Sequence, residues 1–213
     1  MMKPRIFLAD DHALILGGLR SLLEPEFEVV GQATDGKALV ESAVGLRPDA
    51  VVLDISMPLL NGFEAARQLR KLIPQTALIF LSLHLSPAYL KTALQIGVSG
   101  YVLKSNTTDE LRTALATVLK GSLFISPSFG PDILDRLRDR DGGINNETSD
   151  LTDRQREILQ LIVDGRANKD IADRLNLSIK TVEFHRAKIM TKLGARSPAE
   201  LTRLAMQQGI LPL

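Results

Sequence analysis

Short apolar runs alternate with longer amphipathic stretches over the first 120 residues, and this alternation constrains the fold more than any other feature. Runs of strand length lie at Arg5–Ala9, Glu28–Ala33, Ala50–Leu53, Ala77–Ser82 and Gly100–Leu103. Helical patterns fill the gaps, at residues 13–24, 36–45, 63–72, 87–96 and 107–120. Strands that are apolar on both faces are typical of a parallel sheet covered by helices. The pattern therefore predicts a doubly wound α/β domain with a five-stranded parallel sheet.

Carboxylates follow two of the predicted strands at the point where each strand ends. The first strand runs into Asp10 and Asp11, and the third runs into Asp54. Parallel strands share their carboxyl-terminal edge, where open α/β sheets bind ligands, so the three side chains are expected to converge. Like charges gathered in one place need a cation, and an all-oxygen site suits Mg²⁺. A strand-ending Asp can also simply turn the chain or cap the next helix.

The fourth and fifth strands add a hydroxyl and an ammonium to the same edge. Ser82 ends the fourth strand, and Lys104 follows the fifth. This set suits phosphoryl transfer to a carboxylate, with Asp54 as nucleophile and Mg²⁺ held by Asp10, Asp11 and Asp54. Lys104 would pair with a phosphoryl oxygen and Ser82 would hydrogen-bond the product. Each residue alone is more often structural, and it is the joint pattern that favours the functional interpretation.

The chain changes character after Gly121. Residues 122–147 are rich in Pro, Gly, Asn and charge, with one helical pattern at about 131–140, which predicts a linker carrying a short helix. From Leu151 onward four helix patterns follow, with capping-box spacing at Thr152 and Gln155 and again at Ser197 and Glu200. Residues 151–213 carry 11 basic and 7 acidic side chains, an excess that favours a polyanionic partner.

Two of these helices are joined by "LNLS", which ends in Ser178, a residue that can cap the next helix. This arrangement predicts a helix-turn-helix. In the helix at Ile179–Leu193, apolar residues recur at helical spacing and should face the core. The surface opposite or beside them carries Lys180, Glu183, Phe184, Ala187 and Lys188. That surface is expected to enter a major groove of double-stranded DNA, with Lys180 and Thr181 near phosphates. The alternative is a four-helix bundle used only for protein contacts.

Several function classes are excluded by composition. There is no cysteine, and His12, His84 and His185 show no metal-ligand spacing, so thiolate zinc sites and cysteine catalysis are ruled out. No apolar run approaches the ~20 residues of a membrane span, and no signal-peptide apolar region follows the basic start. We expect a soluble, cytoplasmic protein with no membrane partner.

The motifs "ADDH", "LDISMPLLNG", "LSLH" and "GYVLK" resemble the flavodoxin-like receiver domain of bacterial two-component response regulators, over residues 1–121. The resemblance implies that a sensor histidine kinase donates a phosphoryl group to Asp54. It also implies that Ser56 gives a backbone carbonyl to the metal, and that Tyr101 is the switch aromatic paired with Ser82. An ordinary half-buried aromatic is the alternative for Tyr101.

Residues 148–213 resemble the LuxR-type helix-turn-helix domain of the NarL/FixJ response regulators. The resemblance implies a four-helix domain whose third helix is the recognition helix, a last helix often used for dimerisation, and RNA polymerase as a further partner. It also places Asn168 and Lys169 near the DNA backbone. The helical pattern and the resemblance together predict these DNA contacts: Asn168, Lys169, Ser178, Lys180, Thr181, Glu183, Phe184, Ala187 and Lys188.

These features together predict a phosphorylation-dependent transcription factor, an activator that forms a homodimer on its promoter. We expect a stoichiometric phosphoacceptor and not an enzyme, with at most slow autodephosphorylation. One rival is a phosphohydrolase of the haloacid-dehalogenase type, but that family carries DxD at its nucleophile and here Ser56 stands two residues after Asp54. A second rival is a phosphorylation-independent DNA-binding regulator whose receiver is a scaffold.

Overall fold

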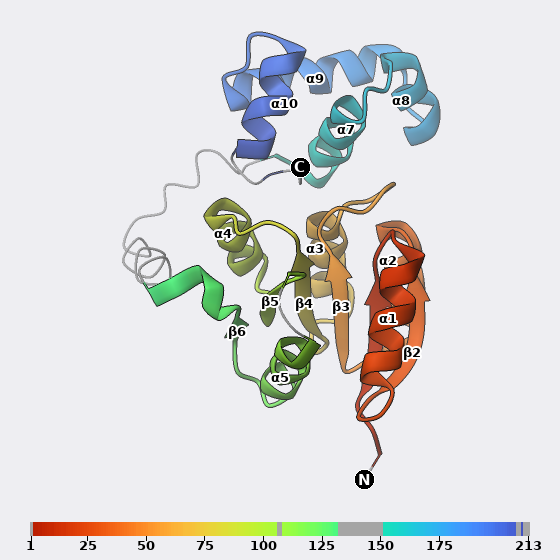
Figure 1. The fold of residues 1–213 in the computed structure, drawn as a ribbon. Helices are drawn as coiled ribbons and strands as arrows, with labels where there is room; N and C mark the ends of the chain where they lie inside the picture. Colours follow the sequence, from red (N-terminus) through yellow and green to blue (C-terminus); the bar gives the residue numbers. More distant parts are fainter. Residues whose placement is uncertain (1, 106–107, 132–150, 208–209, 211–213) are drawn as a thin grey trace. The chain divides into compact units, whose positions relative to one another are not determined.

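The computed structural model describes residues 2–105, 108–131, 151–207 and 210. The chain divides into two compact units, Met1–Arg138 and Asp139–Leu213. The helix predicted at about 131–140 falls almost entirely outside the described residues. Each unit is described by itself below (Figure 1).

The first unit is an α/β domain built on one parallel sheet in the order β2-β1-β3-β4-β5-β6. Its strands are β1 (Arg5–Ala9), β2 (Glu28–Ala33), β3 (Ala50–Asp54), β4 (Ala77–Ser82), β5 (Gly100–Leu103) and β6 (Phe124–Ile125). Its helices are α1 (Ala13–Leu23), α2 (Gly36–Leu46), α3 (Gly62–Leu72), α4 (Pro87–Ile96) and α5 (Thr108–Val118), followed by the 3₁₀ turn η1 (Pro127–Phe129).

The expected five-stranded sheet needs one correction, because the sheet has six strands. The additional strand, β6, pairs with β5 through Gly100 opposite Phe124 and Tyr101 opposite Ile125. Two residues are too few to produce a periodic apolar pattern, so the sequence gives no strand signal there. The chain thus returns to the sheet edge after α5 before it leaves the domain.

Both faces of the central strands of the sheet are buried, as their uninterrupted apolar runs predicted. In β1, Phe7 and Ala9 belong to a core that also holds side chains of α2, α3 and α4. Ile6 and Leu8 belong to a second core, on the other face, with side chains of α1 and α5. Successive residues of a strand point to opposite faces, so the central strands β1, β3, β4 and β5 are covered by helices on both faces, whereas Glu28 and Gln32 of the edge strand β2 are exposed. The domain is therefore doubly wound, as expected.

The loop after β3 is drawn tightly over the end of the sheet by Gly62, the first residue of α3. A Cβ at this position would lie 2.1 Å from the Asp54 carbonyl oxygen. The Gly62 N–H donates to the Ile55 carbonyl (2.8 Å), and the Asn61 side chain caps α3 by accepting from the Glu64 N–H. Close approach of this kind requires glycine. The loop fixes the surroundings of Asp54.

The described part of the second unit contains four helices: α7 (Asp153–Val163), α8 (Asn168–Leu175), α9 (Ile179–Leu193) and α10 (Pro198–Gln207). The capping box of Thr152 and Gln155 is present, and Gly194 ends α9 with φ of 69°. The second predicted box is only half formed. Ser197 Oγ accepts from the Glu200 N–H, whereas the Glu200 carboxylate accepts from the Arg196 N–H.

The core of the second unit is formed by all four helices. In α9, Val182 and Ile189 are fully buried and Leu193 nearly so, which confirms the face assigned from helical spacing. Ala167 stands at the N-cap of α8 without a side-chain hydrogen bond to the helix. The turn between α8 and α9 is shaped by Asn176, which has φ of 51°. No described helix in either unit is both long enough and apolar enough to cross a membrane.

Candidate functional site

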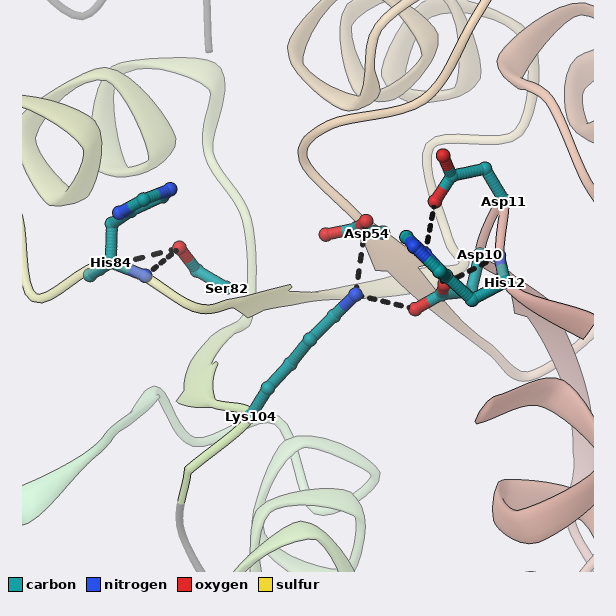
Figure 2. Close-up of polar contacts among 7 residues, drawn as sticks. All are labelled: Asp10, Asp11, His12, Asp54, Ser82, His84 and Lys104. Atoms are coloured by element: carbon teal, nitrogen blue, oxygen red, sulfur yellow. Dashed lines mark hydrogen bonds and ion pairs between the residues drawn. The ribbon is translucent and has the colours of Figure 1, made fainter. Parts of the chain in front are cut away.

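Three of the predicted site residues meet at the carboxyl-terminal edge of the sheet. Asp10 follows β1 and Asp54 ends β3, two strands that pair directly, while Lys104 follows β5 and donates its backbone N–H to the Ser82 carbonyl at 2.8 Å. Lys104 Nζ lies 2.6 Å from Asp10 Oδ2 and 3.0 Å from Asp54 Oδ2. Figure 2 shows the lysine reaching between the two carboxylates. We call Asp10, Asp54 and Lys104 the acid cluster.

The acid cluster is buried, so its charges interact strongly. The side chains of Asp10, Asp54 and Lys104 are 0%, 7% and 8% exposed. Burial raises the pKa of Asp54, and the Lys104 ammonium opposes part of that rise. Burial alone would lower the pKa of Lys104, but the hydrogen bond to Asp10 and the charge of Asp54 outweigh it, and this pKa is raised. Two carboxylates share one ammonium here, which leaves negative charge for a cation to balance.

Asp11 lies at the open side of the acid cluster, with its side chain 33% exposed. It is joined there by His12, whose Nδ1 is 2.6 Å from Asp11 Oδ1 and 3.3 Å from Asp10 Oδ1. The His12 backbone N–H also donates to Asp10 Oδ1 at 2.9 Å. This contact of His12 could not be predicted, because the turn after β1 that brings its ring back to the carboxylates has no periodic pattern in the sequence.

The oxygen donors present fit a hard divalent cation. Asp10, Asp11 and Asp54 offer carboxylate oxygens at one edge, and Mg²⁺ prefers such ligands while retaining waters. The backbone of Ser56 lies beside Asp54, where it hydrogen-bonds the carboxylate. The predicted metal contact of Ser56 is through its carbonyl, and this stays a prediction.

Ser82 and Tyr101 form a second group beside the acid cluster. Ser82 Oγ accepts from the His84 N–H at 3.0 Å and hydrogen-bonds with the Tyr101 hydroxyl, which itself donates to the His84 carbonyl at 3.4 Å. In Figure 2, Ser82 and His84 lie apart from the aspartates, on the far side of Asp54. Tyr101 is fully buried, not half-buried, and burial raises its pKa to about 12.

The chain that leaves the receiver-like unit rests on Tyr101. The Ser126 N–H donates to the Tyr101 carbonyl (2.9 Å), and Ser126 Oγ accepts from the Leu103 N–H (2.9 Å) and donates to Glu110. The ring of Phe129, in η1, packs edge-on against Tyr101 with centroids 5.3 Å apart. Sequence reasoning missed this contact, because it joins residues 28 positions apart in a segment without helix or strand periodicity.

In the second unit, the residues predicted to contact DNA gather on α9 and the start of α8. Those with exposed side chains are Lys169, Ser178, Lys180, Glu183, Phe184, Ala187 and Lys188. Two others are partly buried. Asn168 Oδ1 accepts from Arg186 Nη1 at 3.0 Å, and the Thr181 hydroxyl lies 2.8 Å from the hydroxyl of Ser178, which caps α9.

Each of the two units matches the model of a known protein family. A model described as "Response regulator receiver domain" matches residues 6–116, and one described as "Bacterial regulatory proteins, luxR family" matches residues 149–205. The chain is a response regulator with a LuxR-type DNA-binding domain. The match begins within β1 and ends within α5, so this response regulator carries its acid cluster inside the receiver domain.

Two curated relatives match the regulator along nearly its whole length. "Transcriptional regulatory protein MctR" of Rhizobium johnstonii is 38% identical over 212 residues, covering 98% of this chain and 96% of the relative. "Oxygen regulatory protein NreC" of Staphylococcus carnosus is 34% identical over 214 residues, covering 97% and 99%. Both relatives are therefore similar across the receiver and the DNA-binding domain.

Solved structures of RcsB from Salmonella are similar to the regulator. One, described as showing conformational dynamism for DNA interaction, has a TM-score of 0.64 at 29% identity and covers 97% of this chain and 99% of its own. Another is RcsB bound to promoter P1flhDC in the presence of phosphomimetic BeF3-, with a TM-score of 0.63 at 28% identity, covering 95% and 98%.

Proposed function

We propose that Asp54 is the phosphoryl acceptor of this response regulator and that its modification controls DNA binding. The observation that carries the proposal is the acid cluster, in which buried Asp54 and Asp10 share the Lys104 ammonium at 3.0 and 2.6 Å. The arrangement presents a carboxylate nucleophile beside a fixed positive charge. A sensor histidine kinase is the proposed donor: an Asp54 oxygen forms the P–O bond as the donor's P–N bond breaks.

Asp10, Asp11 and Asp54 would hold Mg²⁺, with the Ser56 carbonyl as a further ligand. The bound ion supplies positive charge that offsets the charge of the phosphoryl oxygens. Lys104 would add a second positive charge, because its ammonium already lies against Asp54. His12 keeps Asp11 and Asp10 oriented through its ring nitrogen and its backbone N–H. The nucleophile, the metal-binding oxygens and the Lys104 ammonium are thus in place before the donor arrives.

The switch proposed for the receiver domain runs from Ser82 to Tyr101. A phosphoryl group on Asp54 adds roughly 1.5 to 2 negative charges and strong acceptor oxygens. Ser82 would exchange its bonds to His84 for a bond to the phosphoryl group, and Tyr101, which hydrogen-bonds with Ser82, would shift with it. Because β6 and η1 rest on Tyr101, the movement reaches the chain that leads to the DNA-binding domain.

The proposed output is a dimer that binds promoter DNA through α9. It activates transcription by RNA polymerase in the cytoplasm. Support comes from relatives: RcsB structures include two dimers bound to two parallel DNAs, at 28% identity and a TM-score of 0.58, and a promoter complex with a phosphomimetic. The exposed lysines of α9 suit a phosphate backbone.

The test is to incubate the protein with Mg²⁺ and a small phosphodonor and to map the modified residue. We expect one phosphoryl group on Asp54 in the wild type and none in Asp54→Asn. Asp109→Asn is the matched control, because Asp109 is an exposed carboxylate on α5 of the same domain and makes no ion pair with Asp10, Asp54 or Lys104. Modification of Asp54→Asn at the wild-type level would refute the assignment of Asp54 as the acceptor.

A further inference from the structure

The exposed face of α9 carries one large apolar side chain. Phe184 is 56% exposed, and it lies on the face opposite the buried Val182, Ile189 and Leu193. Lys188 follows one helical turn later, and its Nζ lies 4.4 Å from the centroid of the Phe184 ring. This distance is within the range of a cation–π interaction. The two side chains therefore form a pair in the middle of the surface expected to contact DNA.

The chemistry of the Phe184–Lys188 pair differs from that of a lysine expected to contact phosphate, such as Lys180. A phenyl ring has no hydrogen-bonding group, and the apolar feature that the major groove offers to it is the C5-methyl group of thymine. The Phe184 ring holds the Lys188 ammonium over its face. The commonest base partner of a lysine is guanine, through O6 and N7. Ala187, also exposed, leaves room beside the ring for a base edge.

We propose that Phe184 and Lys188 together read a thymine and a neighbouring guanine in the operator. This inference rests on the proposed function, since it requires that α9 enters the major groove. Phe184 contacts the thymine methyl, and Lys188, held over the ring, donates to the guanine. Four residues of helix advance about 6 Å, while stacked bases are about 3.4 Å apart. The two bases therefore lie within two base-pair steps of one another.

The role of Lys180 in the same face is expected to differ. It lies in the first turn of α9, four residues before Phe184, and is exposed. A lysine at a helix start that meets the phosphate backbone contributes affinity to every sequence alike and adds about one unit to the salt slope. Lys180→Ala is therefore the matched control: it removes a charge from the same surface without removing base reading.

The experiment begins with selection of binding sites from a random duplex library by the phosphorylated full-length protein. Each selected thymine is then replaced by deoxyuridine, which removes only the methyl group, and each guanine by 7-deazaguanine, which removes N7. Affinities are measured for the wild type and for Phe184→Ala, Phe184→Leu, Lys188→Ala and Lys180→Ala. Thermal unfolding of each variant verifies that the DNA-binding domain is intact.

We expect deoxyuridine at one thymine per half-site to weaken wild-type binding about fourfold, the value of one buried methyl group. Phe184→Ala should bind the thymine and deoxyuridine sites equally, while Phe184→Leu should retain part of the difference. Lys188→Ala should lose the effect of 7-deazaguanine within two steps of that thymine. Lys180→Ala should weaken all sites equally.

Two results would overturn the inference. If Phe184→Ala discriminates thymine from deoxyuridine as well as the wild type does, the ring does not read the methyl group. If the selection enriches no sequence at all, α9 is not a base-reading helix, and the proposed function falls with the inference. The first result leaves the proposed function standing, so the two failures are distinguishable.

Discussion

Lys104→Met should destabilise the receiver domain strongly, because it removes the ammonium that Asp10 and Asp54 share. The three side chains are at most 8% exposed, and the nitrogen lies 2.6 and 3.0 Å from the two carboxylates. Removing one partner of a buried ion pair costs about 3 to 5 kcal/mol. We expect the lower end, about 3 kcal/mol, since the site opens to solvent at Asp11.

Tyrosine fluorescence during urea denaturation measures this loss in the full-length protein. The chain has two tyrosines and no tryptophan, and both tyrosines, Tyr89 and Tyr101, lie in the receiver domain. The signal therefore reports unfolding of that domain alone. The midpoint should fall while the m-value stays constant, which marks a change in stability without a change in the surface exposed on unfolding.

A second substitution tests the physical cause. Asp54→Asn in the Lys104→Met background removes one of the two carboxylate charges and should recover part of the lost stability. Lys37→Met is the matched control, because Lys37 is 71% exposed and pairs with Glu41 at 3.9 Å, so its loss should cost under about 0.5 kcal/mol. If Lys104→Met proves as stable as Lys37→Met in metal-free buffer, the electrostatic account of the acid cluster is wrong.

Three further predictions follow from the packing around the site. Burial raises the pKa of Tyr101 from about 10 in the unfolded chain to about 12 in the folded protein, so about 2.7 kcal/mol of folding stability, fully present below pH 10, is lost as the pH rises through 12. Tyr101→Phe should lack this loss in alkaline denaturation, and an unchanged dependence of its stability on pH would contradict the burial argument. Phe129→Ala empties a buried site against Tyr101 and should cost about 3 to 5 kcal/mol by urea denaturation, whereas Phe129→Leu should cost less; equal costs would show that the ring is not packed as described. Gly62→Ala should lower the receiver's thermal midpoint, because its Cβ would meet the Asp54 carbonyl at 2.1 Å, and a wild-type midpoint would mean that the loop moves freely.

Most of the receiver fold could be predicted because its central strands are buried on both faces. That burial requires continuous apolar runs, and the five predicted strands agree with the structure, apart from β3, which extends one residue to Asp54. The meeting of Asp10, Asp54 and Lys104 also follows from the sequence, because parallel strands end at one edge of a sheet. Topology alone was sufficient there.

The parts that could not be predicted depend on short segments and on side-chain direction. β6 has two residues, so periodicity cannot reveal it, and the packing of Phe129 on Tyr101 depends on where that strand places the chain. The same holds for His12, which reaches Asp11 through a turn. Ser82 bonds to the His84 backbone because of the loop conformation after β4, which no residue pattern specifies.

The central claim is that a phosphoryl group on Asp54 controls DNA binding by α9. The most direct measurement compares the mass in solution and the affinity for a selected operator duplex, before and after treatment with Mg²⁺ and a small phosphodonor, for the wild type and Asp54→Asn. The account predicts that phosphorylation shifts the wild type toward a dimer and tightens binding, while Asp54→Asn responds in neither assay. Equal operator affinity for phosphorylated and untreated wild type, with Asp54 fully modified, would contradict it.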